Sequence, residues 1–172
     1  KEYDLIEKTI LNSKFKKIYL LGGNHDESQS NKSFSILPLR NNSRVELILE
    51  PCQKIIEGKK FMFMPHYVYS ETFPPMKEYY QNPPQELIDN DYLAYHIEDE
   101  TISFGKRKHG IDLSKWKGKR LGGHIHKIQP NYELGMPVQS RFDEKGQKNN
   151  LFSIDGNKES FIDIPKFVDY YD

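Results

Sequence analysis

Four side chains of this sequence are of the kinds that bind transition-metal ions, and separate segments of the chain carry them. They are Asn24, His96, His124 and His126. Imidazole nitrogens and oxygen donors are ligands that suit Mn, Fe, Zn and Co ions. Taken singly, each histidine has a simpler interpretation as a surface residue or a hydrogen-bonded structural residue. Together they favour a dinuclear metal site, which requires several donors delivered from rigid elements.

The spacing of two of these histidines supports two ions rather than one. His124 and His126 are one residue apart, and on an extended segment that spacing sends the two imidazoles to opposite sides of the backbone. Glycine pairs precede both His124 and Asn24. Because glycine lets the backbone turn tightly and approach a ligand closely, both segments are suited to a binding loop.

The elements expected to position these residues are strands. Residues 16–21 predict a short buried strand that ends at the first glycine pair, residues 91–97 predict a strand leading to His96, and residues 120–121 lead in the same way to the second glycine pair. In open α/β sheets, sites gather at the carboxyl ends of strands. The sequence therefore predicts an α/β fold with the candidate ligands at one edge of a sheet.

The rest of the chain predicts further strands and few helices. Apolar residues at helical spacing predict an opening helix, and residues 27–40 favour a broken helix that ends near Pro38. Strands are expected at residues 44–50 and 59–64, and a hairpin at residues 151–164. Residues 67–84 contain two proline pairs, which favour an irregular surface excursion.

Composition sets broad limits. The 172 residues fit one domain spanning residues 1–172, and the 25 basic and 25 acidic residues balance, so any electrostatic attraction for nucleic acid must be local. The single cysteine, Cys52, cannot form an internal disulfide. The lone cysteine favours a reducing, cytoplasmic setting. No apolar run approaches the roughly 20 residues of a membrane helix, so we expect a soluble protein with no membrane partner.

Three segments resemble the motifs of calcineurin-like metallophosphoesterases. Gly23-Asn24-His25-Asp26 is similar to their GNH[DE] motif, a lone histidine follows at His96, and Gly123-His124-Ile125-His126 is similar to their GHxH motif, in the family's order. The resemblance implies a sandwich of two mostly mixed β-sheets flanked by helices. It also implies hydrolysis of a phosphate ester, because two cations roughly 3.5 to 4 Å apart can activate a water and stabilise the attacking and leaving oxygens.

The resemblance also assigns roles. It implies that Asn24, His96 and His124 hold one ion and that His126 helps to hold the second. His25 would donate a proton to the leaving oxygen or stabilise charge on the phosphate, and Asp26 would orient His25. Mn²⁺ is the cofactor that the family implies, with Fe, Zn, Co and Mg as alternatives.

Two motifs of the family are absent from the sequence. No Asp-x-His occurs, and nothing before Gly22 is similar to the Gly-Asp motif whose aspartate bridges the two ions in that family. Both would precede Lys1, so we expect that the family domain is N-terminally truncated in this chain and that residues 1–172 alone are inactive. A degenerate homologue is the alternative.

The segment after the last motif resembles SbcD-type repair exonucleases and their phage recombination relatives. It contains Tyr132-Glu133-Leu134-Gly135-Met136-Pro137, followed by Arg141-Phe142-Asp143-Glu144. The resemblance implies a DNA exo- or endonuclease of repair and recombination in a bacterial or phage-infected cell. It suggests an SbcC-type ATPase subunit as a partner and leaves a homodimer open.

A local excess of basic residues agrees with a DNA substrate. Eight basic residues and one acid lie between Lys106 and Lys127. Lys106, Arg107 and Lys127 are candidates for contacts with backbone phosphates. A solvated basic loop is the alternative. Trp116, within this segment, is a candidate for stacking on a base or for the core.

Other interpretations stay open. His66 follows a predicted strand and is a candidate for substrate contact, with a structural role as the alternative. A phosphatase or nucleotide phosphodiesterase of the same superfamily is the first alternative function. The second is a binding module on the same fold without catalytic activity.

Overall fold

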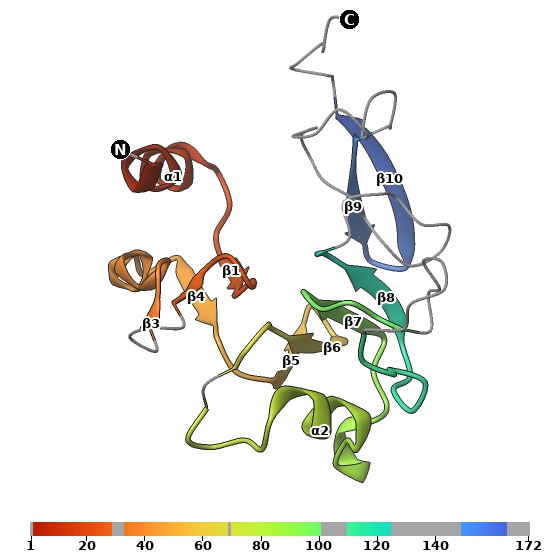
Figure 1. The fold of residues 1–172 in the computed structure, drawn as a ribbon. Coiled ribbons are helices and arrows are strands. Elements are labelled where there is room, and N and C mark those ends of the chain that lie inside the picture. Colours follow the sequence, from red (N-terminus) through yellow and green to blue (C-terminus); the bar gives the residue numbers. More distant parts are fainter. Residues whose placement is uncertain (1, 29–32, 69, 101–109, 125–148, 165–172) are drawn as a thin grey trace, which may run out of the picture.

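The computed structural model describes residues 2–28, 33–68, 70–100, 110–124 and 149–164 (Figure 1). Among these residues the chain is mixed α/β, with several small sheets and few helices. In chain order the elements are α1 (Glu2–Asn12), β1 (Ile18–Leu21), β2 (Glu27–Ser28), β3 (Ser33–Phe34), the 3₁₀ helix η1 (Leu37–Asn41), β4 (Val45–Ile48), β5 (Cys52–Ile56), β6 (Lys59–Met64), α2 (Met76–Gln81), the 3₁₀ helix η2 (Gln85–Leu87), β7 (Tyr92–Tyr95), β8 (Lys119–Gly122), β9 (Asn149–Asp155) and β10 (Lys158–Ile164).

The largest sheet has four strands in the order β5-β6-β7-β8. Strands β6, β7 and β8 are parallel, and β5 pairs antiparallel to β6. A two-residue turn joins β5 to β6, and both of its residues have positive φ, 49° at Glu57 and 79° at Gly58. Such turns match the twist of the two strands they connect.

A second pair of parallel strands, β1 and β4, lies next to this sheet. The amide of His66, after β6, donates to the carbonyl of Gly22, after β1, at 2.9 Å. The rings of Tyr19 and Phe63, each three residues earlier, lie 5.7 Å apart. Strands β1 and β6 therefore run in the same direction, and their carboxyl ends meet.

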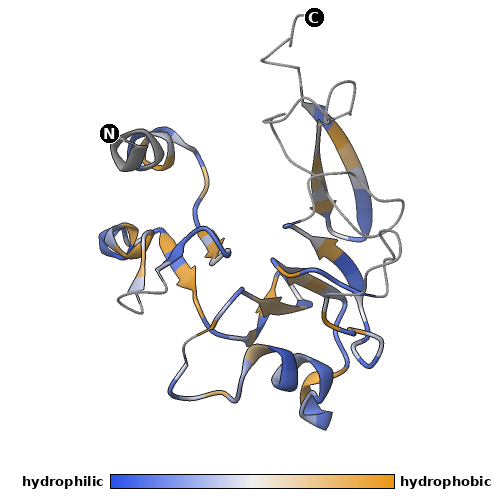
Figure 2. Cartoon of the chain, viewed as in Figure 1, coloured by the Kyte–Doolittle hydropathy of each residue, from blue (hydrophilic) through white to orange (hydrophobic). Residues whose placement is uncertain are grey.

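Alternate residues of β6 and β7 face the main core. Met62, Met64, Leu93 and Tyr95 are at most 1% exposed. They form one cluster with aromatic residues from α2 and from the segments that follow it, which also contains Tyr67, Tyr79, Tyr80, Ile97, Ile111, Leu113 and Trp116. Most of α2 has the colour of hydrophilic residues in Figure 2, and its buried residues are Tyr79 and Tyr80.

The hairpin β9–β10 contacts residues of β7 and β8. The ring centroids of Tyr92 and Phe152 lie 6.3 Å apart, and the Tyr92 hydroxyl donates to Glu159 at 2.7 Å. Lys119 forms an ion pair with the same carboxylate. This predicted hairpin is confirmed.

Helix α1, also predicted, is held at its carboxyl end by Arg44. The guanidinium donates to the carbonyls of Ile10 and Ser13 at 2.5 and 2.9 Å. The last carbonyls of a helix have no partner within the helix, so a cation at this position satisfies them. Ile10 packs with Ile36, Leu39 and Val45 in a second small core.

Two sequence-based expectations were wrong. Residues 27–40 form no α-helix where the structure describes them; the segment contains β2 and β3, and η1 begins at Leu37 with Pro38 in its first turn. Residues 67–84 are not irregular throughout, because α2 begins directly after Pro74 and Pro75. Proline is tolerated where a helix starts, since the first amides have no intrahelical acceptor.

No described helix is long and apolar enough to cross a membrane.

Candidate metal centre

The carboxyl ends of β1, β6, β7 and β8 form one edge, and backbone hydrogen bonds continue past the strands there. The amide of His96 donates to the carbonyl of Met64 at 3.1 Å, and the amide of Gly123 donates to the carbonyl of Tyr95 at 2.7 Å. These bonds continue the parallel ladders by one residue. They place the residues that follow each strand side by side, as the sequence predicted.

Three of the predicted ligands converge at this edge. The amide oxygen Oδ1 of Asn24 lies 3.0 Å from Nε2 of His96 and 3.3 Å from Nδ1 of His124. The two imidazole rings are nearly perpendicular, with centroids 5.4 Å apart. Residues separated by as many as 100 positions in the chain therefore share one point in space.

These separations suit donors around a single cation. Two ligands about 2.1 Å from one ion lie about 3.0 Å apart in octahedral geometry and about 3.4 Å apart in tetrahedral geometry. A hydrogen bond from either ring to the Asn24 oxygen fits the same distances. One amide oxygen and two imidazoles form a donor set that suits Mn, Fe, Zn or Co.

The cluster contains only two residues of the most common ligand types. Among the described residues, no three His, Cys, Asp or Glu side chains are grouped so that they could hold an ion. Asn24 must therefore supply the third donor of any site formed by these residues. The fourth predicted ligand, His126, lies outside the described residues, as do Lys106, Arg107 and Lys127.

Glycines before the ligands give the His96 ring its space. A Cβ atom on Gly23 would lie 2.9 Å from Nε2 of His96, and one on Gly123 would lie 3.1 Å from Nδ1. Both distances are shorter than a side chain accepts without displacing the ring. The second glycine of each pair, Gly23 and Gly123, is therefore required by packing around one imidazole.

His124 has an unusual backbone conformation. Its φ is 77°, in the left-handed region that non-glycine residues seldom adopt. Such conformations cost roughly 1–3 kcal/mol and occur most often at functional sites. The conformation turns the chain directly after β8 and brings the His124 ring to Asn24.

His96 is held in its neutral form. Burial, and then the neighbouring charges of His124 and His66, lower the pKa of His96 to about 4. Because an uncharged imidazole has a lone pair to offer, His96 is ready to bind a cation near neutral pH.

The predicted catalytic pair, His25 and Asp26, lies next to the cluster. His25 is exposed. The Asp26 carboxylate accepts a hydrogen bond from the amide of Gly23 at 2.9 Å, and the Asp26 amide donates to the Gly23 carbonyl at 3.1 Å. Asp26 therefore fixes the loop that carries Asn24. Its predicted role in orienting His25 stays a prediction.

Sequence reasoning missed Glu27. Its side chain is only 2% exposed, and its carboxylate accepts from the Val68 amide at 2.7 Å and lies 3.0 Å from Nδ1 of His66. It thus ties the segment after β6 to β2. An acid directly after the GNHD segment was the only signal for it.

The described members of the basic segment have partners on the protein. Lys117 pairs with Asp89 at 2.8 Å, and Arg120 pairs with the buried Asp99 at 3.3 Å. Lys115 donates to Asn82, and Lys119 pairs with Glu159. Trp116 is 3% exposed and its indole donates to the Tyr80 carbonyl at 2.7 Å, so its core interpretation is confirmed and stacking on a base is excluded.

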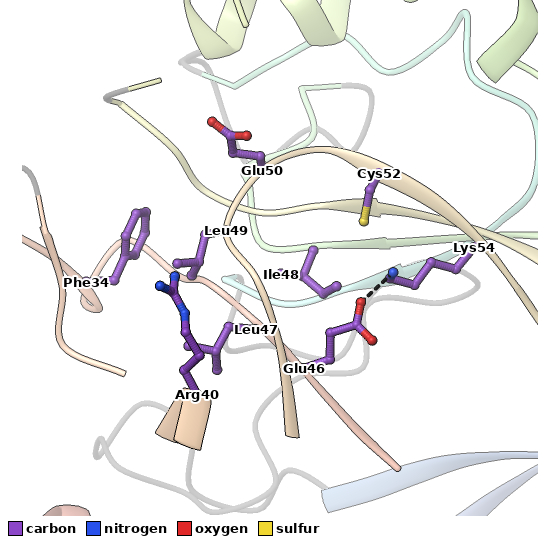
Figure 3. Close-up of a pocket in the computed structure, with 9 residues that line it drawn as sticks. All are labelled: Phe34, Arg40, Glu46, Leu47, Ile48, Leu49, Glu50, Cys52 and Lys54. Atoms are coloured by element: carbon purple, nitrogen blue, oxygen red, sulfur yellow. Dashed lines mark ion pairs between the residues drawn. The ribbon is translucent and has the colours of Figure 1, made fainter. Parts of the chain in front are cut away.

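A cavity of about 430 Å³ runs along β4 and the start of β5 (Figure 3). Glu46 and Lys54 form an ion pair in its wall, and the hydrogen bond from Lys54 lowers the pKa of Glu46. It is lined by none of the predicted site residues. Cavity size alone therefore does not mark the candidate metal centre.

No protein family, no curated protein and no solved structure matches this chain.

Proposed function

We propose that this protein hydrolyses phosphodiester bonds in DNA with the help of divalent cations, and that it has a metallophosphoesterase-type fold of two mixed sheets flanked by helices. The observation that carries the proposal is the convergence of Asn24, His96 and His124 on one point at 3.0 and 3.3 Å. Three separate strand ends supply these side chains, each from a segment similar to a metal-binding motif of that superfamily.

Each residue has a defined part in this reaction. Asn24 Oδ1, His96 Nε2 and His124 Nδ1 would hold one cation, and His126 would contribute to a second. When bound, the cations supply Lewis acidity for the phosphate and a more acidic water. His25, exposed beside Asn24, would give a proton to the leaving oxygen. Asp26 and the two glycines keep the loop and the His96 ring in position.

Mn²⁺ is the expected ion, and DNA is the expected polymer. An SbcC-type ATPase and a second copy of the chain are the proposed protein partners, in the cytoplasm of a bacterial or phage-infected cell. The support for these finer points is the resemblance of the sequence after His126 to repair exonucleases.

A second candidate is a phosphatase or nucleotide phosphodiesterase at the same site. The observation that favours it is the pairing of Lys117, Lys119 and Arg120 with Asp89, Glu159 and Asp99. Cations that already have carboxylate partners contribute less to the binding of a polyanion, whereas a small phosphoester requires no extended basic surface.

Hydrolysis assays separate these functions. The full-length protein and its His124→Ala variant are assayed in Mn²⁺ on linear DNA and on a small chromogenic phosphodiester. Cleavage of DNA that falls steeply with salt and is lost in the variant supports the nuclease. Cleavage of only the small diester supports the second candidate. Absence of both activities in the wild type refutes both and leaves a binding module.

A further inference from the structure

Glu27 and His66 form a carboxylate–imidazole pair beside the proposed metal centre. The Glu27 side chain is 2% exposed, and the His66 side chain is 20% exposed. One carboxylate oxygen lies 3.0 Å from Nδ1 of His66, and the other accepts from the Val68 amide at 2.7 Å. A buried carboxylate is costly unless its oxygens are hydrogen-bonded, and here both are.

The pair fixes the chemical state of the imidazole. A carboxylate only accepts hydrogen bonds, so Nδ1 of His66 must carry a proton, and in the neutral ring Nε2 is then an acceptor. The same arrangement orients metal-binding and catalytic histidines in many sites.

His66 also lies at the right edge of the sheet. Its amide bonds to the carbonyl of Gly22, two residues before Asn24, and the strand it follows is adjacent to the one that ends at His96. His66 therefore lies at the same edge as the predicted ligands, with a partly exposed imidazole.

We propose that His66 is a further catalytic residue, whose Nε2 accepts a proton from the attacking water, and that Glu27 is its positioning residue. The water oxygen forms a bond to phosphorus while its proton passes to Nε2. The bond from phosphorus to the leaving oxygen breaks, and that oxygen keeps the electron pair and takes a proton from His25. This inference rests on the proposed phosphodiester hydrolysis.

A purely structural clamp between the two loops is the competing explanation, and two substitutions separate them. His66→Asn places an amide nitrogen where Nδ1 was, so it can still donate to Glu27, but it lacks Nε2. Glu27→Gln can still accept from the Val68 amide, but its own amide donates to Nδ1 of His66, which moves the ring proton to Nε2. Both variants keep the clamp and remove the acceptor.

The matched control is Glu50→Gln. The Glu50 carboxylate accepts from the Ser70 hydroxyl at 2.8 Å and so holds the same excursion of the chain by a similar bond. In the described part of the chain, its side chain bonds to Ser70 and to none of the predicted ligands. We expect its kcat to equal that of the wild type.

The experiment measures kcat and KM for a small phosphodiester in Mn²⁺ with the full-length protein, together with thermal unfolding and the imidazole ¹⁵N spectrum. The expected result is a loss in kcat of about 100-fold or more in His66→Asn and in Glu27→Gln, with KM and unfolding temperature nearly unchanged. The wild-type spectrum should show His66 protonated at Nδ1, and Glu27→Gln should reverse this.

Wild-type kcat in both variants would overturn the inference and leave Glu27 and His66 as a clamp. If the wild type is active and His124→Ala is not, that outcome would leave the proposed function standing. If the wild type itself cleaves no phosphoester, the proposed function fails first and this inference fails with it. If either variant fails to fold, the wild-type spectrum still tests the inference. A wild-type His66 that is protonated at Nε2 would overturn it.

Discussion

The core beneath α2 and the cluster at the strand ends both contain polar aromatic side chains, but they use their polar atoms differently. In the core, the Tyr80 hydroxyl donates to the Pro65 carbonyl at 2.8 Å and the Trp116 indole donates to the Tyr80 carbonyl at 2.7 Å. Each group has a backbone partner of its own. In the cluster, His96 and His124 both face the single amide oxygen of Asn24.

This difference separates stability from function. Buried polar groups in a core are satisfied one by one, because an unpaired group costs roughly 1–3 kcal/mol. In the cluster, His124 adopts a φ of 77°, and the His96 ring leaves no room for a Cβ on Gly23 or Gly123. Such a backbone conformation lowers the stability of the fold. That arrangement is expected where a ligand, rather than the fold, requires it.

The largest expected effect is on the core side. Trp116→Ala removes a nearly buried indole together with its hydrogen bond and should lower the free energy of unfolding by about 3–5 kcal/mol. The measurement is urea denaturation. At temperatures where the variant stays folded, its kcat should match that of the wild type. A much lower kcat in the folded variant would contradict the separation of stability from function.

The opposite pattern is expected for His124→Ala. It removes one metal donor. Because alanine also has a Cβ, the left-handed backbone at this position stays about as strained, and the free energy of unfolding should change by less than about 1 kcal/mol. Metal-dependent hydrolysis should fall by at least about 100-fold. If His124→Ala unfolds readily but keeps its activity, the cluster serves stability rather than function, which would contradict the comparison.

A smaller effect is expected from Gly23→Ala. The new Cβ would meet Nε2 of His96 at 2.9 Å and displace the ring from Asn24. Mn²⁺ affinity should fall by about 10-fold or more. Gly123→Ala, whose Cβ would lie 3.1 Å from Nδ1 of the same ring, should have a weaker effect. If both variants bind Mn²⁺ as tightly as the wild type, the His96 ring does not require glycine at these two positions.

A separate effect is expected on the pH dependence of folding in the metal-free protein. The pKa of His96 is about 4 in the folded chain, below its ordinary value of 6.5. Between these values the unfolded chain binds more protons, so the free energy of unfolding should fall as pH decreases from 6.5 to 4. His96→Gln should flatten this slope. An unchanged slope in that variant would assign the effect to other groups.

The sequence could predict those parts of the fold that local pattern decides. The opening helix, the strands that end at Gly22 and His96, and the last hairpin follow from periodicity and turn residues. Strand β5 was missed because its turn, Glu57-Gly58, is a weaker hairpin signal than Asn-Gly. Helix α2 was missed because Pro74 and Pro75, directly before its first residue, were taken as a sign of irregular structure.

The candidate site divides in the same way. Residue type and glycine spacing singled out Asn24, His96 and His124, and the fold brings them together. Glu27 could not be found, because a sequence does not distinguish a buried acid from an exposed one. The ion pairs of Lys117 with Asp89 and of Lys119 with Glu159 could not be predicted either, because these partners come from other segments of the chain.

The most direct test is a Mn²⁺ titration of the full-length protein, followed by electron paramagnetic resonance, with the wild type beside Asn24→Ala, His96→Ala and His124→Ala. If these three side chains hold one ion, each variant should bind Mn²⁺ at least about 10-fold more weakly while remaining folded, and the wild-type spectrum should show coupling to imidazole nitrogen. Wild-type binding in all three variants, or no binding by the wild type, would contradict a metal centre at Asn24, His96 and His124.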